Sequence, residues 1–343
     1  MSTSGSKSNE HVAHFLVDIH KFSSQQSSLL HIFTAMASRN EVPIHCHTTA
    51  HSFALLNNYG NGIIYINLGG YMSIKVTKHS IDKETRSVIS GRYKRITRAI
   101  NRSFWNSESE TEHSMYVGSY GRGTAINTSD LDVLFILPES EYNHFNSLNR
   151  NGPSRLLQAV KDALLATYPL TKIKGDGQIV SVDFSDGIRF EILPAFKRMS
   201  LWGWDGTYIY PDTHMGGNWL STNPRAEIDA MNKKDAENST NKLLTATCQH
   251  IRYIRDKYFS SYHLSGILID SFVYNHIGGW HFTRQGEDAT RSINTFEEHL
   301  LNEYNRVSFN GLITPNILAP GSGMPVDASK GWEVLGKILR KMV

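Results

Sequence analysis

Two stretches of the chain alternate apolar and polar residues, which is the pattern typical of β-strands. Residues 180–185 alternate in this way, and residues 188–193 repeat the alternation after an Asp-Gly pair. Because Asp-Gly favours a tight turn, the pattern predicts a β-hairpin whose second strand stops at Pro194. Residues 130–137 form a short run of branched and aromatic residues closed by Pro138, which predicts a buried strand.

Apolar residues recur at helical spacing in several other stretches. Between about residues 81 and 105 they form a continuous stripe, made of Ile89, Tyr93, Ile96, Ile100 and Phe104. A second helix is predicted after Gly152-Pro153, and from about residue 227 onward helical patterns dominate. Strands mixed with helices, followed by a helical region, predict an α+β fold.

The first 70 residues have a different composition from the rest. Serine and histidine are frequent, residues 23–28 are a polar tract, and four glycines interrupt residues 60–70. We expect residues 1–71 to be an N-terminal extension that need not be well ordered, such as one added by an upstream start. We expect it to lie outside the catalytic unit.

Bulk composition limits the classes of protein. The chain has 343 residues, 40% of them hydrophobic, which is enough for one two-lobed unit or two small domains. Its net charge of +3 suits anionic substrates without requiring a nucleic-acid polymer. Two cysteines far apart in sequence exclude a disulfide framework. With no signal peptide and no run of about 18 apolar residues, we expect a cytoplasmic protein without direct membrane insertion.

Two aspartates at the start of the predicted strand are candidate metal ligands. Asp130 and Asp132 are two residues apart, so on a strand they project to the same side, about 6–7 Å apart. Carboxylates this close repel each other unless a cation lies between them. Carboxylate oxygens are also the ligands that hard divalent cations prefer.

A glycine-rich turn precedes these aspartates. Gly118 and Ser119 follow a predicted strand end, and Gly121 and Gly123 let the backbone approach a ligand closely. A short helix beginning near Ser119 would direct backbone amides at an anion. Each motif alone is weak, and an ordinary turn with two chance aspartates is the alternative. Together, their order and spacing favour a site for a nucleoside triphosphate and two divalent metals.

A second metal beside an attacking hydroxyl needs a third carboxylate. Glu191 and Asp183 both lie on the non-apolar faces of the predicted hairpin. We favour Glu191, which comes just before Leu-Pro-Ala-Phe in the second strand. For Asp183 a solvated surface position is the simpler interpretation, and such a position remains an alternative for Glu191.

These residues resemble those of the polymerase-beta-like nucleotidyltransferases, and within them the bacterial cGAS/DncV-like nucleotidyltransferases that synthesise oligonucleotide second messengers. The resemblance covers roughly residues 72–343. Beyond the Gly-Ser turn and the three acids, it includes residues 209–212, 216–219, 222–224, 250–257, 264–270 and 319–322. One departure is Glu191, where the wider superfamily more often has aspartate.

The resemblance implies a polymerase-beta-like palm, a mixed sheet with a long spine helix, followed by a C-terminal helical lobe. It places the nucleotidyltransferase catalytic lobe at residues 72–210 and the helical lobe at 211–343. The implied enzyme joins nucleoside triphosphates, ATP among them, into a cyclic di- or trinucleotide and releases pyrophosphate. In anti-phage signalling of the CBASS type, that product activates a separate effector protein.

The resemblance also implies roles for individual residues. Asp130, Asp132 and Glu191 would be the catalytic and metal-binding acids, with two Mg²⁺ or Mn²⁺ ions per site. Gly118 and Ser119 would hold phosphates. In the family, a basic residue and a serine of the C-terminal helices contact the triphosphate. The candidates here, among which one sequence does not decide, are Arg252, Arg255, Ser261 and Ser265.

Two other functions fit the same motifs. One is a nucleotidyltransferase that modifies a tRNA, an antibiotic or a protein, and the other is a catalytically silent nucleotide-binding regulator. Animal relatives bind a nucleic-acid activator along the long helix, which here carries Arg92, Lys94, Arg95, Arg98 and Arg102. We expect a solvated basic face instead, because no aromatic residues interleave for base stacking.

Overall fold

The chain divides into two compact units, Met1–Tyr71 and Met72–Val343. In this computed structural model the described residues are 46–49, 52–56, 63–67, 74, 79–148, 151–214, 217–283 and 295–343. The first unit contains a three-stranded antiparallel sheet of β1 (Cys46–Thr49), β2 (Ser52–Leu56) and β3 (Ile63–Asn67). The polar tract at 23–28 and Gly216 of the motif at 216–219 lie outside the described residues. That the first unit lies outside the catalytic unit stays a prediction.

A mixed seven-stranded sheet forms the base of the second unit. Its path is β10-β9-β8-β5-β4, and β7 pairs with both β8 and β6. Strands β5 and β8 run parallel, whereas the other pairs are antiparallel. The strands are β4 (Ser114–Tyr116), β5 (Leu131–Ile136), β6 (Lys172–Asp176), β7 (Ile179–Asp183), β8 (Arg189–Ser200), β9 (Gly203–Asp212) and β10 (Asn218–Thr222).

The prediction that the hairpin's second strand stops at Pro194 is wrong, because β8 continues to Ser200. On one edge, β8 pairs with β7 up to Ile192 and with β9 from Phe196 onward. Pro194 lies between these two partners, so its missing N–H leaves no ladder hydrogen bond unmade on that edge. The strand can therefore pass through a proline while Pro194 pairs with Phe135 of β5 on the other edge.

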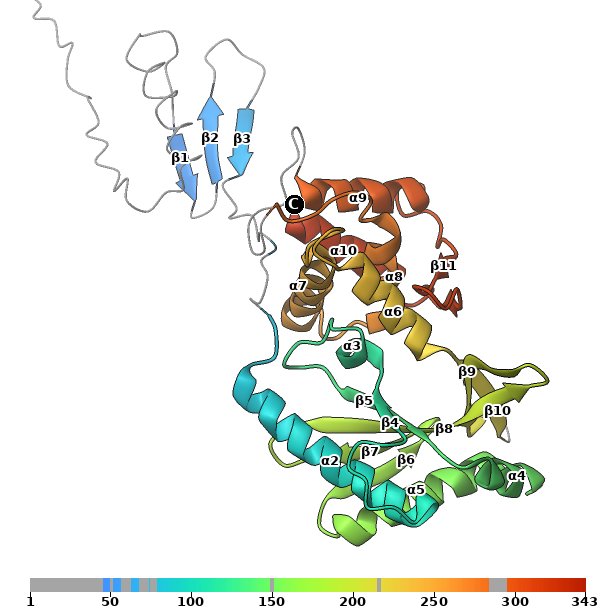
Figure 1. Ribbon diagram of the computed structural model, residues 1–343. Coiled ribbons are helices and arrows are strands. Elements are labelled where there is room, and N and C mark those ends of the chain that lie inside the picture. The colour runs from blue at the N-terminus through green and yellow to red at the C-terminus, as the bar shows by residue number, and fades with distance from the viewer. Residues whose placement is uncertain are drawn as a thin grey trace, which may run out of the picture. The chain divides into compact units, whose positions relative to one another are not determined.

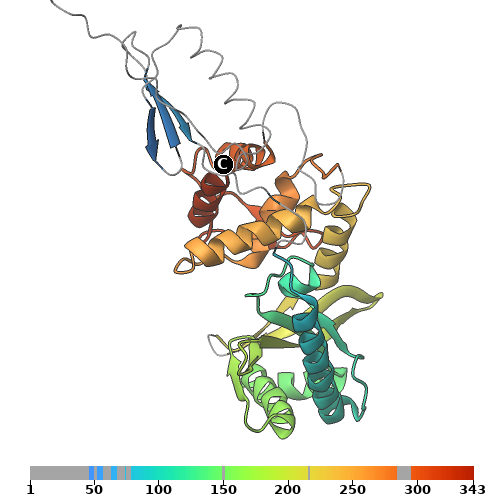
Figure 2. The same cartoon turned by 90° about the vertical axis from the view of Figure 1, so that its left-hand side faces the viewer.

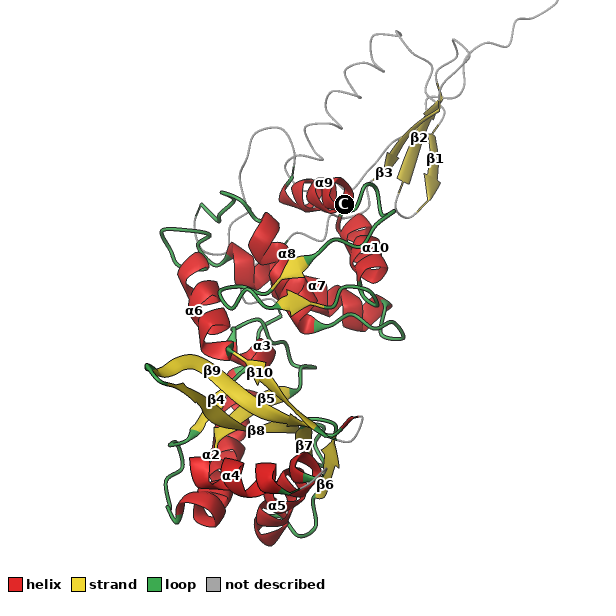
Figure 3. Cartoon of the chain, turned by 90° about the vertical axis from the view of Figure 1, so that its right-hand side faces the viewer, coloured by secondary structure: helices red, strands yellow, loops and turns green. Residues whose placement is uncertain are grey.

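Helices α2 (Lys83–Trp105) and α5 (Gly152–Thr167) cover one face of this sheet, together with α4 (Glu139–Ser147) (Figures 2 and 3). The predicted stripe of α2 faces the core, where Ile96 is fully buried. The core joins α2 and α5 to strand residues such as Val133 and Phe190. The side chain of Asp82 caps α2 by accepting from the Thr85 backbone N–H at 2.8 Å.

The remaining helices form a lobe of their own (Figure 1). They are α6 (Pro224–Lys234), α7 (Leu243–Tyr258), α8 (Gly266–His276), α9 (Phe296–Val307) and α10 (Trp332–Met342), with a short hairpin of β11 (Ile317–Leu318) and β12 (Pro325–Val326). A second core, which includes Ile251, Phe272 and Leu335, holds them together. The predicted α+β fold, a mixed sheet with a long helix plus a helical lobe, is confirmed. The lobe boundary at residue 210 stays a prediction.

The short helix α3 (Gly118–Gly121) lies where the sheet meets the helical lobe (Figures 1 and 3). It follows β4 directly and leads by a loop into β5. The sequence pattern predicted a short helix beginning near Ser119, as observed. This position brings the glycine-rich turn, the acids of β5 and β8, and the helices α7 and α8 to one place.

Candidate active site

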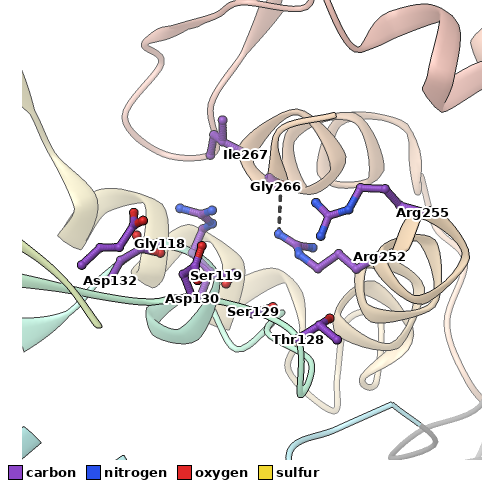
Figure 4. Close-up of a pocket in the computed structure, with 12 residues that line it drawn as sticks. Gly118, Ser119, Thr128, Ser129, Asp130, Asp132, Arg252, Arg255, Gly266 and Ile267 are labelled. Carbon is purple, nitrogen blue, oxygen red and sulfur yellow. Dashed lines mark hydrogen bonds between the residues drawn. The ribbon is translucent and has the colours of Figure 1, made fainter. Parts of the chain in front are cut away.

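A polar cavity of about 240 Å³ opens at this junction. Its lining combines the turn at α3, the three predicted acids and residues of α7 and α8. The lining residues are Gly118, Ser119, Arg122, Thr128, Ser129, Asp130, Asp132, Glu191, Arg252, Arg255, Gly266 and Ile267. Figure 4 shows the two aspartates beside the Gly-Ser turn, with the two arginines on the opposite side of the cavity.

The parallel pairing of β5 and β8 explains why the acids share this cavity. Asp132 and Glu191 are directly paired in register, and Asp130 precedes the first residue of β5. Burial raises the pKa of Asp132 to about 7, with a further rise from the Glu191 carboxylate, while Arg122 opposes both. Burial and mutual repulsion also raise the pKa of Glu191, and burial raises that of Asp130. The three carboxylates therefore form a site of concentrated negative charge.

Gly118 is required by the position of Asp132. Its φ of +56° lies in the left-handed region, and a Cβ added there would come within 1.9 Å of Asp132 Oδ2. The adjacent backbone N–H of Ser119 lowers the pKa of Asp132. The conformation of the turn therefore leaves room for the Asp132 carboxylate, and the turn also lines the cavity.

We expect Gly118→Ala to reduce catalytic activity by about a hundredfold or more, because the added methyl group must displace Asp132 by an ångström or more. Steady-state kinetics of the purified variant measure the loss. Gly91→Ala is the matched control, since a Cβ on this α2 residue meets no atom within 4 Å. Activity of Gly118→Ala equal to that of the control would contradict this account of the turn.

Arg122 is a cavity residue that the sequence did not single out. Its guanidinium is buried and donates from Nε to Asp270 Oδ2 and from Nη1 to Glu227 Oε2, both at 2.9 Å. Thr124 Oγ1 also donates to Asp270 at 2.9 Å. The turn after α3 is thus tied to α8 through Asp270 and to α6 through Glu227. The only signal in the sequence was a charged residue within a glycine-rich run.

The structure separates the two candidate arginines of α7. Arg252 is 1% exposed, and it donates to both oxygens of Asp270, at 2.6 and 2.9 Å, and to two backbone carbonyls. Arg255 has a 20% exposed side chain, which donates to Asp256 and to the Leu264 carbonyl. Arg252 therefore has a structural role on this geometry, and Arg255 is the better candidate for a phosphate.

The candidate serines lie near the cavity without lining it. Ser265 is the N-cap residue of α8 and directly precedes the lining residue Gly266. Ser261 is exposed in the turn between α7 and α8. The role of either serine stays a prediction.

The donor set fits Mg²⁺ or Mn²⁺, because three carboxylates in one polar cavity supply the hard oxygen ligands these ions prefer. The rise in the pKa of each acid is relieved by a bound cation. Among the residues that the structure describes, no three acidic, histidine or cysteine side chains converge as a ready-made ligand cluster. Glu191 is engaged elsewhere, because its Oε1 lies 3.0 Å from Arg189 Nη2. Asp183 does not line the cavity.

Residues 75–235 match the model of the family described as the Second Messenger Oligonucleotide or Dinucleotide Synthetase domain. Comparison with curated proteins gives no match. Among solved structures, the chain is similar to the STING-associated CdnE c-di-GMP synthase from Capnocytophaga granulosa, with 14% identity and a TM-score of 0.55 over 77% of this chain and 81% of that chain. It is also similar to the Bradyrhizobium diazoefficiens CD-NTase CdnG in complex with GTP, with 12% identity and a TM-score of 0.53 over 77% and 86%.

A third structure, the Elizabethkingia meningoseptica CdnE cyclic dinucleotide synthase with GTP and Apcpp, has 15% identity and a TM-score of 0.50 over 76% of this chain and 97% of that chain. At these identities the structures show only a shared fold. The match to the family model indicates the class of enzyme, an oligonucleotide synthetase, for residues 75–235. Residues 75–235 thus form a second-messenger oligonucleotide or dinucleotide synthetase domain, which is a nucleotidyltransferase domain, on a fold that the second unit shares with bacterial CD-NTases.

Proposed function

We propose that this protein joins nucleoside triphosphates into a cyclic di- or trinucleotide and releases pyrophosphate, in a reaction that depends on divalent metal. The observation that carries the proposal is the single cavity that holds both halves of such a site. The glycine-serine turn and the two aspartates lie on one side and Arg255 lies on the other, and Glu191 also lines the cavity. A triphosphate between them would meet backbone amides, a guanidinium and carboxylate-bound metal.

Each residue has a defined task in this proposal. Gly118 and Ser119 bind the β- and γ-phosphates, and Arg255 balances their charge from α7. Asp130, Asp132 and Glu191 would hold two Mg²⁺ or Mn²⁺ ions, which supply Lewis acidity to the α-phosphate and lower the pKa of the acceptor hydroxyl. The acceptor oxygen forms a bond to the α-phosphorus, and the bond to the pyrophosphate oxygen breaks.

The substrates proposed are nucleoside triphosphates, with ATP among them. The similar structures from Elizabethkingia and Bradyrhizobium contain GTP, the first together with Apcpp. A net charge of +3 is compatible with such anions. We further propose that the product acts in CBASS-type anti-phage signalling in the cytoplasm, through a separate effector protein.

A nucleic-acid activator is not part of the proposal, because most of the basic face of α2 is already paired. Arg92 donates to both oxygens of Asp186, Arg98 pairs with Glu110, and Arg102 donates to Glu108 at 2.6 Å. Phosphates would have to displace these carboxylates.

No helix among the described residues has both the length and the apolarity to cross a membrane.

We expect the purified chain, incubated with four nucleoside triphosphates and Mg²⁺ or Mn²⁺ alone, to yield pyrophosphate and a phosphatase-resistant nucleotide. Mass spectrometry of that nucleotide identifies the bases and the ring size. Glu191→Gln is the matched control, since it keeps the shape of the side chain and removes its charge. Nucleotide binding without any product would favour the silent regulator. Product only after addition of tRNA, an antibiotic or a protein would favour the other acceptors.

A further inference from the structure

Arg189 lies beside the third carboxylate, on the same strand two residues before it. One arm of its guanidinium, Nη2, is 3.0 Å from Glu191 Oε1. The other side faces Asp183 of β7, with Nε 3.6 Å from Oδ1. The charge of Arg189 opposes the rise in pKa of Glu191 that burial causes, and it also acts on Asp130. The arginine is therefore electrostatically part of the acidic site, although it does not line the cavity.

A ladder of alternating charge continues from Arg189 across the sheet. Asp183 is the direct cross-strand partner of Arg189, and Lys172 of β6 is in turn the partner of Asp183. Lys172 Nζ lies 3.3 Å from Asp183 Oδ2. Across β6, β7 and β8 the side chains are therefore positive (Lys172), negative (Asp183) and positive (Arg189). Arg189 also contacts Glu191. Asp183 thus draws Arg189 in the direction away from Glu191.

Arg189 is held more loosely than the arginine in the core of the site. Its Nε is buried and makes no hydrogen bond among the described residues, because Asp183 is beyond hydrogen-bonding distance. Its side chain is 39% exposed. Arg252, in contrast, has four hydrogen bonds and is 1% exposed. Because Arg189 has an unsatisfied N–H and an open side, moving it would break fewer hydrogen bonds than moving Arg252.

From this geometry we propose that Arg189 is a positioning residue, a built-in counter-ion that holds Glu191 until a divalent cation replaces it. The inference rests on the proposed function, because it takes Glu191 as a metal ligand. It accounts for the absence, among the described residues, of a ready-made cluster of three ligands at a site lined by three acids. A cation that binds must compete with a guanidinium, so Arg189 sets the metal concentration at which the site fills.

The test is a titration of the full-length protein with Mn²⁺ in the absence of nucleotide. Electron paramagnetic resonance measures the concentration of free Mn²⁺ and so gives the dissociation constant. Arg189→Met removes the competing charge, so we expect Mn²⁺ to bind roughly tenfold more tightly. Arg189→Lys keeps a cation and should bind like the wild type. Arg198→Met is the matched control, because Arg198 is on the same strand but pairs with Asp205 at 2.7 Å, and its binding should be unchanged.

A second variant covers the case in which Arg189→Met does not fold. Asp183→Asn releases Arg189 toward Glu191, and we expect it to weaken Mn²⁺ binding severalfold. Unchanged or weaker binding in a folded Arg189→Met variant, or tighter binding in Asp183→Asn, would overturn the inference. If the wild type binds no Mn²⁺ and Glu191→Gln does not differ from it, the proposed metal site itself fails, and the inference fails with it.

Discussion

Asp132→Asn is expected to abolish product formation, with a loss of roughly a thousandfold or more. Asp132 lines the cavity beside Gly118, is paired in register with Glu191, and would hold metal together with the other two acids. The amide keeps the shape of the side chain but carries no charge, so we expect a loss of about 4 kcal/mol of transition-state stabilisation for a carboxylate that would hold the metal. Single-turnover assays with saturating nucleotide and Mn²⁺ measure the chemical step directly. Wild-type activity in this variant would end the assignment.

The Asp132→Asn variant should keep its fold, and its stability should depend less on pH than that of the wild type. The pKa of Asp132 is about 7 in the folded protein against an ordinary value of 3.8, so the folded state binds more protons between these two values. Stability in the absence of divalent ions therefore falls as the pH rises from about 4 through 7. Asp132→Asn removes this contribution. Thermal melts with a chelator at pH 5 and pH 8 should show a smaller difference for the variant, and an unchanged difference would refute this account.

Asp270→Ala is expected to destabilise the protein by about 3–5 kcal/mol. Asp270 is completely buried and accepts hydrogen bonds from Arg122, Thr124 and both terminal nitrogens of Arg252. These partners hold its pKa at about 2 against the effect of burial. Among the described residues, its removal leaves Arg122 with Glu227 as an ion-pair partner and leaves Arg252 without one. Urea denaturation followed by circular dichroism measures the change.

Asp205→Ala provides the comparison for that stability measurement. It also removes an aspartate paired with an arginine, but Asp205 and Arg198 are both exposed, so little change is expected. If the two variants unfold at the same urea concentration, the cluster around Asp270 does not stabilise the protein. Because Arg122 directly follows α3, a folded Asp270→Ala fraction should also bind nucleotide more weakly.

Local patterns were sufficient for the elements that position the acids. The run of branched and aromatic residues at 130–137 predicted β5, and the alternation in residues 188–193 predicted part of β8. The spacing of Asp130 and Asp132 predicted that they project to the same side, and both line the cavity. The long helix begins two residues later than predicted and ends where predicted, at Trp105. These features depend on period and turn chemistry, which a single sequence carries.

Long-range pairings were not predictable from the same patterns. Arg122 and Asp270 are 148 residues apart, and only the folded chain reveals that they meet. Arg252 and Arg255 are on the same helix in similar local sequence. Their different burial depends on which side of α7 packs against α8. The passage of β8 through Pro194 depends on where two neighbouring strands end. In each case the deciding information lies in a partner that is distant in sequence.

The anchoring of the glycine-rich turn limits how relatives of this enzyme can be recombined. Arg122 and Thr124 enter from the sheet side, while their acceptors Glu227 and Asp270 are on α6 and α8. A chimera that exchanged the helical part for that of a distant homologue would have to bring both acidic acceptors with it. Without them, the grafted protein would lose the geometry of its own glycine-rich turn, even though every residue of that turn was unchanged.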